Sequence, residues 1–137
     1  MSIVLDNSVA LAWCFKDERT ALSIALLDRV ARDGAVAPQL WPLEAVNGLL
    51  AAERRRRIDR ETRLTLTGFL AKLPITIDPE TADRTWSATA RLAETHRLSA
   101  YDAAYLELAQ RLGLPLATQD SALIAAARAV GVGLAGE

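Results

Sequence analysis

The sequence has very few of the residues on which several common kinds of chemistry depend. Of its 137 residues, only Cys14 is a cysteine and only His96 is a histidine. A single cysteine excludes an internal disulfide framework and a thiolate metal cluster. Any serine–histidine triad or histidine-ligated zinc site would have to use His96, which lies in the segment AETHRLS, typical of the exposed end of a helix. The sequence therefore points away from thiol and histidine chemistry.

Lysine is also rare, and the charge is nearly balanced. Lys16 and Lys72 are the only lysines among 16 basic residues, which face 17 acidic residues and leave a formal net charge of −1. This balance argues against a general polyanion-binding protein, although it leaves room for a local basic patch. The most basic run is ERRRR at 53–57, which is typical of a solvated helix end. Arginine also suits paired hydrogen bonds to carboxylate or phosphate.

Long uncharged segments are missing as well. The longest uncharged runs are too short, or too interrupted by proline, to span a bilayer, and the start MSIVLDNS resembles no signal peptide. We therefore expect a soluble, cytoplasmic protein with no membrane partner. Hydrophobic residues make up 51% of the chain, enough for a packed core. Without any linker-like or repetitive segment, we expect a single domain over 1–137.

Hydrophobic patterning predicts strands that alternate with helices. The predicted strands are 2–6, 35–38, 74–77, 115–118 and a weak last one at 132–135. The predicted helices are 7–15, 18–34, 41–57, 59–73, 78–97, 99–113 and 121–131. Such alternation is typical of a parallel sheet covered on both faces. We expect a three-layer α/β/α fold with a central parallel sheet of about four to five strands.

Four acidic residues lie where such a fold places functional groups. Asp6 ends the first strand and Asp120 lies just after the fourth, while Glu44 and Asp102 are each near the start of a helix. The crevice of an open parallel sheet lies beyond the carboxyl ends of its strands, and helix N-termini face it. Each acid could instead cap a helix or favour its dipole, and Ser99 with Asp102 fits a capping box. Together, the four acids indicate a single site.

Four carboxylates in one crevice would repel one another unless a cation held them. Oxygen ligands alone suit Mg²⁺ or Mn²⁺, which can polarise a phosphoryl oxygen and activate water for phosphodiester hydrolysis. Ser8 and Thr118 lie two residues from Asp6 and Asp120, and Asn47 lies one helical turn after Glu44. We expect these three polar groups to orient the carboxylates or a water held by the metal, although each could be an ordinary cap or turn residue.

Three segments resemble the PIN domain, and most of all the VapC-type toxins of prokaryotic toxin–antitoxin pairs. They are IVLDNSVALAWCFKDE, WPLEAVNGLL and LSAYDAAYLELAQRLGLPLATQDSALIAAARAVGV, which together run from residue 3 to about 133. The resemblance implies metal-dependent endonucleolytic cleavage of RNA. It also implies a homodimer and a cognate antitoxin whose tail would bind between the early helices, at residues 18–57, and place a basic residue among the acids.

The resemblance assigns the acidic sites in order. The first falls on Asp6 with Ser8, the second on Glu44 with Asn47, the third on Asp102, and the fourth on Asp120 with Thr118. They are expected to bind the metal and to be catalytic. Some relatives have a further acid beyond the fourth, where this chain has Ser121 and Ala122. It therefore stays open whether Asp120 binds the metal directly or through water.

Several other assignments stay open. Position 7 is Asn, where relatives often have a small residue, and we expect little consequence. We expect Tyr101 and Tyr105 to pack rather than to stack on substrate. Phosphate contact by the basic run would use Arg54, Arg55, Arg56 and Arg57.

Alternative functions for the whole chain are a PIN nuclease of RNA processing without a toxin role, a receiver-like phosphoacceptor domain, and an inactive binding module. A receiver-like domain would need a lysine at the end of a late strand, and both lysines fall elsewhere.

Overall fold

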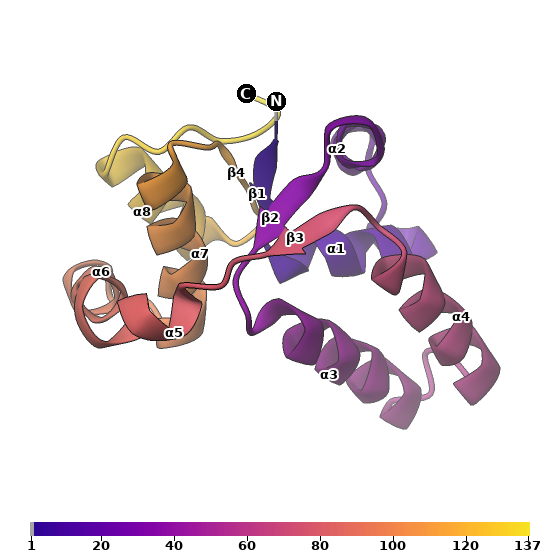
Figure 1. Ribbon diagram of the computed structural model, residues 1–137. Coiled ribbons are helices and arrows are strands. Elements are labelled where there is room, and N and C mark those ends of the chain that lie inside the picture. The colour runs from indigo at the N-terminus through magenta and orange to yellow at the C-terminus, as the bar shows by residue number, and fades with distance from the viewer. Residues whose placement is uncertain (1) are drawn as a thin grey trace.

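A computed structural model describes residues 2–137 and has a four-stranded parallel sheet at its centre (Figure 1). The strands are β1 (Ile3–Leu5), β2 (Ala35–Ala37), β3 (Ile75–Ile77) and β4 (Leu116–Ala117), in the spatial order β3-β2-β1-β4. Every pairing between neighbours is parallel. All three residues of β1 are buried, as expected for a strand with helices over both faces.

Helices form a layer on each side of the sheet (Figure 1). One layer holds α1 (Asn7–Cys14), α2 (Ala21–Asp33), α3 (Trp41–Arg54) and α4 (Arg60–Ala71), with a 3₁₀ turn at Lys16–Glu18. The other holds α5 (Thr81–Arg84), a π-helical turn (Thr85–Thr89), α6 (Ala90–His96), α7 (Ala100–Leu112) and α8 (Ser121–Ala129). The three-layer α/β/α fold predicted from the sequence is confirmed. No helix within residues 2–137 combines the length and apolarity that a bilayer crossing needs.

Local signals set several helix ends. Asp59 caps α4 by accepting a 2.8 Å hydrogen bond from the Thr62 amide, and Pro42 lies in the first turn of α3, as the sequence predicts. Gly34 ends α2 with a φ of 78°, a backbone conformation that residues other than glycine rarely adopt.

Two predicted elements differ from the structure. The predicted helix at 78–97 begins only at Thr81, because Asp78, Pro79 and Glu80 form the turn after β3, and its middle is a π turn. The predicted last strand at 132–135 is wrong: a single parallel bridge between Leu116 and Leu134 replaces it. That segment meets β4, which is itself only two residues long, so it has little backbone to pair with.

Helix α7 is buried along its middle, from Ala103 to Ala109. This stretch includes Glu107, which is 4% exposed. Arg111, one turn further along, pairs with Glu107 and with Asp78, the residue after β3, at 2.7 Å each. This buried ion network joins α7 to the carboxyl end of β3.

The strand order creates a crevice beside β1. The chain moves outward from β1 to β2 and β3, then returns to place β4 on the other side of β1. Such a reversal separates the connections at the carboxyl ends of β1 and β4 and opens a binding crevice there. Asp6 follows β1, and the segment 118–120 follows β4, so both lie at this crevice.

Candidate active site

The Asp6 carboxylate is held by two hydroxyl groups. Ser8 Oγ donates to Asp6 Oδ2 at 2.7 Å, and Thr118 Oγ1 donates to the same oxygen at 2.8 Å. Backbone amides fix both hydroxyls, since Gln119 N donates to Ser8 Oγ at 3.0 Å and Asp120 N donates to Thr118 Oγ1 at 3.1 Å. Asp6 occupies the N-cap position of α1 but makes no side-chain capping hydrogen bond, and the backbone amides of Asn7 and Ser8 at the start of that helix also favour its charged form.

Glu44, in the first turn of α3, is bound by a buried tyrosine. Tyr105 donates a 2.6 Å hydrogen bond from its hydroxyl to Glu44 Oε1, and its side chain has no exposed surface. Burial, together with the neighbouring Glu44, raises the pKa of Tyr105, so the phenol stays protonated and remains a donor. Packing of Tyr105, as predicted, is confirmed. Its role as partner of Glu44 was missed, although Tyr105 lies three residues after Asp102 and so on the same face of α7.

The other two acids also lie at helix starts. Asp120 caps α8, because its Oδ2 accepts a 2.8 Å hydrogen bond from Leu123 N. Ser99 Oγ accepts a 3.0 Å hydrogen bond from Asp102 N and caps α7. The predicted capping box is half correct: among the hydrogen bonds of residues 2–137, none runs from the Ser99 amide to the Asp102 carboxylate.

Burial raises the pKa values of three carboxyl groups, and repulsion by neighbouring acids adds to the increase for two of them. Burial raises the pKa of Asp6 above its ordinary value of 3.8, and the hydrogen bonds from Ser8 and Thr118 only partly oppose it. Burial raises the pKa of Glu44, and the charges of Asp6 and Asp102 add to the increase.

Burial likewise raises the pKa of Asp102, and the charges of Asp6 and Asp120 add to it. The four acids predicted from the sequence thus lie within electrostatic reach of one another, around one crevice.

The donor atoms fit a hard divalent cation. The hydrogen bonds from Ser8 and Thr118 are accepted by Asp6 Oδ2 and not by Oδ1. The hydrogen bond from Tyr105 is accepted by Glu44 Oε1 and not by Oε2. Asn7 Oδ1, on the residue after Asp6, is a buried acceptor with no hydrogen-bond partner among the described residues. No role for this atom was predicted from the sequence.

The arrangement does not form a tight metal cage. Within residues 2–137, no three His, Cys, Asp or Glu side chains lie close enough to hold a metal together. Mg²⁺ usually keeps several waters and binds through one or two carboxylates. The oxygen-only donor set therefore fits an ion held partly through water.

A hollow of about 390 Å³ adjoins Glu44 and is lined by Leu40, Leu43, Glu44, Asn47 and Tyr101. Asn47 and Glu44 share one face of α3, as predicted, but Asn47 is exposed and its amide bonds to no group within residues 2–137. The packing predicted for Tyr101 is wrong, because 66% of it is exposed. It is the second residue of α7, whose buried stretch begins only at Ala103.

The four arginines at the end of α3 and directly after it, Arg54 to Arg57, have different surroundings. Arg57 pairs with Asp17 and Glu18 at 3.1 Å each, and its guanidinium lies 4.3 Å from the centroid of the Phe15 ring. In the described part of the chain, no ion pair involves Arg54, Arg55 or Arg56, and all three are exposed. Arg57 is thus already paired with two carboxylates and an aromatic ring, while the other three remain available to an anion.

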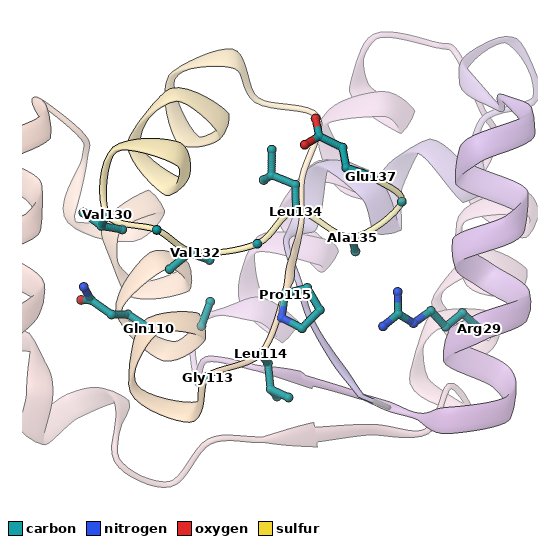
Figure 2. Close-up of a pocket in the computed structure, with 14 residues that line it drawn as sticks. Arg29, Gln110, Gly113, Leu114, Pro115, Val130, Val132, Leu134, Ala135 and Glu137 are labelled. Carbon is teal, nitrogen blue, oxygen red and sulfur yellow. The ribbon is translucent and has the colours of Figure 1, made fainter.

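A cavity of about 610 Å³ lies elsewhere, between the C-terminal segment and the turn before β4 (Figure 2). Arg29 of α2 extends toward it, and Pro115, Leu134 and Ala135 line it. Since Pro115 precedes β4, this cavity is at the amino ends of the strands, away from the four acids.

Solved structures share this fold. PAE2754 from Pyrobaculum aerophilum matches with a TM-score of 0.68 and 26% identity, over 92% of this chain and 79% of that one. FitAcB from Neisseria gonorrhoeae matches with a TM-score of 0.67 and 19% identity, over 98% and 96%. FitAB bound to the IR36 DNA fragment matches with a TM-score of 0.59 and 18% identity, over 98% and 93%. Among curated proteins, no sequence match was found.

The sequence model of the PIN domain matches residues 3–129, from the first residue of β1 to the last residue of α8. The matched range includes the crevice between β1 and β4 and all four acids around it. The chain therefore belongs to the PIN domain family, whose members are typically nucleases.

Proposed function

We propose that the chain is a Mg²⁺- or Mn²⁺-dependent endoribonuclease and the toxin of a toxin–antitoxin pair. The main support is the group of mutually repelling carboxylates around Asp6, at the crevice of a PIN fold. A protein maintains several carboxylates with raised pKa values in one crevice at a cost to stability, which is typical of functional sites. The toxin assignment rests on the resemblance to VapC-type sequences.

In this proposal Asp6, Glu44, Asp102 and Asp120 hold the ion. When bound, the ion would polarise a phosphoryl oxygen and make water a better nucleophile. Ser8 and Thr118 hold Asp6 through Oδ2, and we propose that Oδ1 binds the ion. Tyr105 holds Glu44 in the same way through Oε1. Asn47 presents a free amide on the Glu44 side of the site, where water or substrate would meet it.

RNA would extend from the acids along α3. Glu44 and Arg54 are separated by ten positions of one helix, about 15 Å at 1.5 Å per residue. Arg54, Arg55 and Arg56 are thus placed to contact phosphates a short way along the strand. Such contacts would strengthen binding without reading sequence and would weaken as salt increases.

Exposed apolar side chains on the early helices would bind the antitoxin and a second copy of the chain. Ile24 is 49% exposed and lines a hollow of about 410 Å³ together with Trp13, Leu27, Leu66 and Phe69. This hollow is our proposed site for the antitoxin tail, whose basic residue would then reach the acids and replace part of the ion's charge. A purified complex that cleaves RNA as fast as the free protein would contradict this inhibition.

We also propose a homodimer through the apolar faces of α2 and α3. Leu22 and Val46 are 53% and 42% exposed on these helices. Light scattering at micromolar concentration should give the mass of two chains, and a monomeric mass would count against the dimer.

The function is tested with purified protein and single-stranded RNA. Cleavage should need Mg²⁺ or Mn²⁺, stop with excess chelator, and leave DNA of the same sequence intact. Asp6→Asn should lose most of the activity, while Glu94→Gln, which alters an exposed acid on α6, should retain it. Full cleavage in excess EDTA would refute the metal proposal.

A PIN nuclease of RNA processing is the alternative. It predicts the same site chemistry but no antitoxin. Mapping RNA ends after induced expression, and looking for an adjacent small antitoxin gene, separates the two.

A further inference from the structure

Two hollows meet at Tyr101. The first, of about 390 Å³, reaches Glu44 and Asn47 on α3. The second, of about 330 Å³, reaches Thr81 and Thr85 in the neighbouring layer of helices. Tyr101 and Leu40 line both hollows and therefore lie between them. The first hollow adjoins the carboxylate crevice, because Glu44 lines the hollow and is also one of the four acids of the crevice.

Tyr101 is an exposed aromatic residue directly beside a site acid. It precedes Asp102 in α7, it is 66% exposed, and its hydroxyl makes no hydrogen bond within residues 2–137. Leu43, across the first hollow, is 77% exposed. The ring thus contributes neither to the core nor to the hydrogen bonding of the site.

We propose that Tyr101 stacks on an unpaired nucleobase of the RNA substrate, and that the Asn47 amide contacts the edge of that base. This inference rests on the proposed nuclease function. Single-stranded RNA is commonly bound by stacking of bases on aromatic rings together with hydrogen bonds to base edges. An exposed ring, an apolar side chain and a free amide in one hollow supply these contacts.

The first hollow suits the base better than the second. In the second hollow, Thr81 Oγ1 already donates to Asp78 Oδ2 at 3.0 Å, and Thr85 Oγ1 donates to the Thr81 carbonyl at 2.8 Å. The amide of Asn47 in the first hollow has no partner in the described chain. Glu44 lines the first hollow, so this hollow is also the nearer one for the base of a nucleotide whose phosphate lies at the acids.

The test uses single-stranded RNA in which 2-aminopurine replaces one base at a time, since stacking quenches its fluorescence. Asp6→Asn protein is used so that the RNA stays intact. We expect quenching at one position, its loss in Asp6→Asn/Tyr101→Ala, and its retention in Asp6→Asn/Tyr101→Phe. Trp86 is 88% exposed and lines neither hollow, so Asp6→Asn/Trp86→Ala is the matched control and should quench normally.

Kinetics give a second readout. With Asp6 intact, Tyr101→Ala should lower kcat/KM by about tenfold, mostly through KM, and Tyr101→Phe should restore it. The inference is wrong, and the nuclease function stands, if the wild type cleaves RNA and two further results are found. Asp6→Asn/Tyr101→Ala would still quench the 2-aminopurine fluorescence, and Tyr101→Ala would cleave RNA as well as the wild type. If Tyr101→Ala converts a dimer to a monomer, the ring covers a second copy and the inference is also wrong. No cleavage by the wild type would refute the proposed function itself.

Discussion

Thr118 and Asp6, 112 positions apart in the sequence, are joined by a 2.8 Å hydrogen bond from Thr118 Oγ1 to Asp6 Oδ2. The bond links the end of β4 to the end of β1, the two strands between which the chain reverses direction across the sheet. It therefore depends on the correct pairing of strands from opposite ends of the chain. It also occupies Oδ2 of Asp6, the same oxygen that accepts from Ser8.

Replacing Thr118 should reduce activity without unfolding the protein. Thr118→Val removes the hydrogen bonds to Asp6 and from the Asp120 amide, so Ser8 is the one hydroxyl group left on the Asp6 carboxylate among the described residues. We expect RNA cleavage to fall about 10–100-fold, the usual cost of losing a group that orients a metal ligand. Thr118→Ser keeps the hydroxyl and should stay near wild type. Equal activity of the valine and serine variants would show that the hydroxyl has no role.

The stability of metal-free protein should depend on the charge of Asp6. Its pKa in the folded protein is raised above the ordinary value of 3.8, so its contribution to stability is present below that pH and is lost as pH rises through the folded pKa. Asp6→Asn should therefore unfold at a higher temperature than wild type at neutral pH in EDTA, and the difference should shrink toward about pH 4. Glu94→Gln serves as control. A variant less stable than wild type at neutral pH would contradict the argument.

Loss of the Tyr105 hydroxyl should affect Glu44. Tyr105→Phe removes the 2.6 Å bond to Oε1 and leaves the ring in the core. A hydrogen bond to a charged group is worth about 1.5–3 kcal/mol, so we expect cleavage to fall about 10–150-fold and the metal concentration needed for half-maximal activity to increase. Circular dichroism should show an unchanged fold. Metal titrations that superimpose on those of wild type would argue against a role for this bond.

The buried ion network should contribute to stability alone. Arg111→Met leaves Asp78 and Glu107, each with a side chain 5% exposed, without their cation. Removing one partner of a buried ion pair typically costs about 3–5 kcal/mol. Arg84→Met removes a pair with Glu80 that is 44% and 49% exposed, and should cost less than about 0.5 kcal/mol. Urea denaturation measures both, and a similar small loss for the two variants would contradict the difference.

The sequence predicted the layers and the grouping of the four acids because both follow from short-range patterns and from one rule about parallel sheets. The π turn at Thr85–Thr89 could not be predicted, since the apolar spacing of a helix does not distinguish a single wider turn. Exposure of Tyr101 was missed for another reason. An apolar run shows the period of a helix, but not how far its first turn projects beyond the core.

Because α7 is buried, local opening elsewhere in the structure should leave its part of the site in place. Strand β3 has two exposed residues out of three, whereas α7 is enclosed from Ala103 to Ala109, so its amides should exchange with solvent only when the whole domain opens. Asp102 and Tyr105 both belong to α7. Partial opening at the edge of the sheet should thus leave these two groups in position, and the proposed catalytic arrangement should be lost only when the domain unfolds.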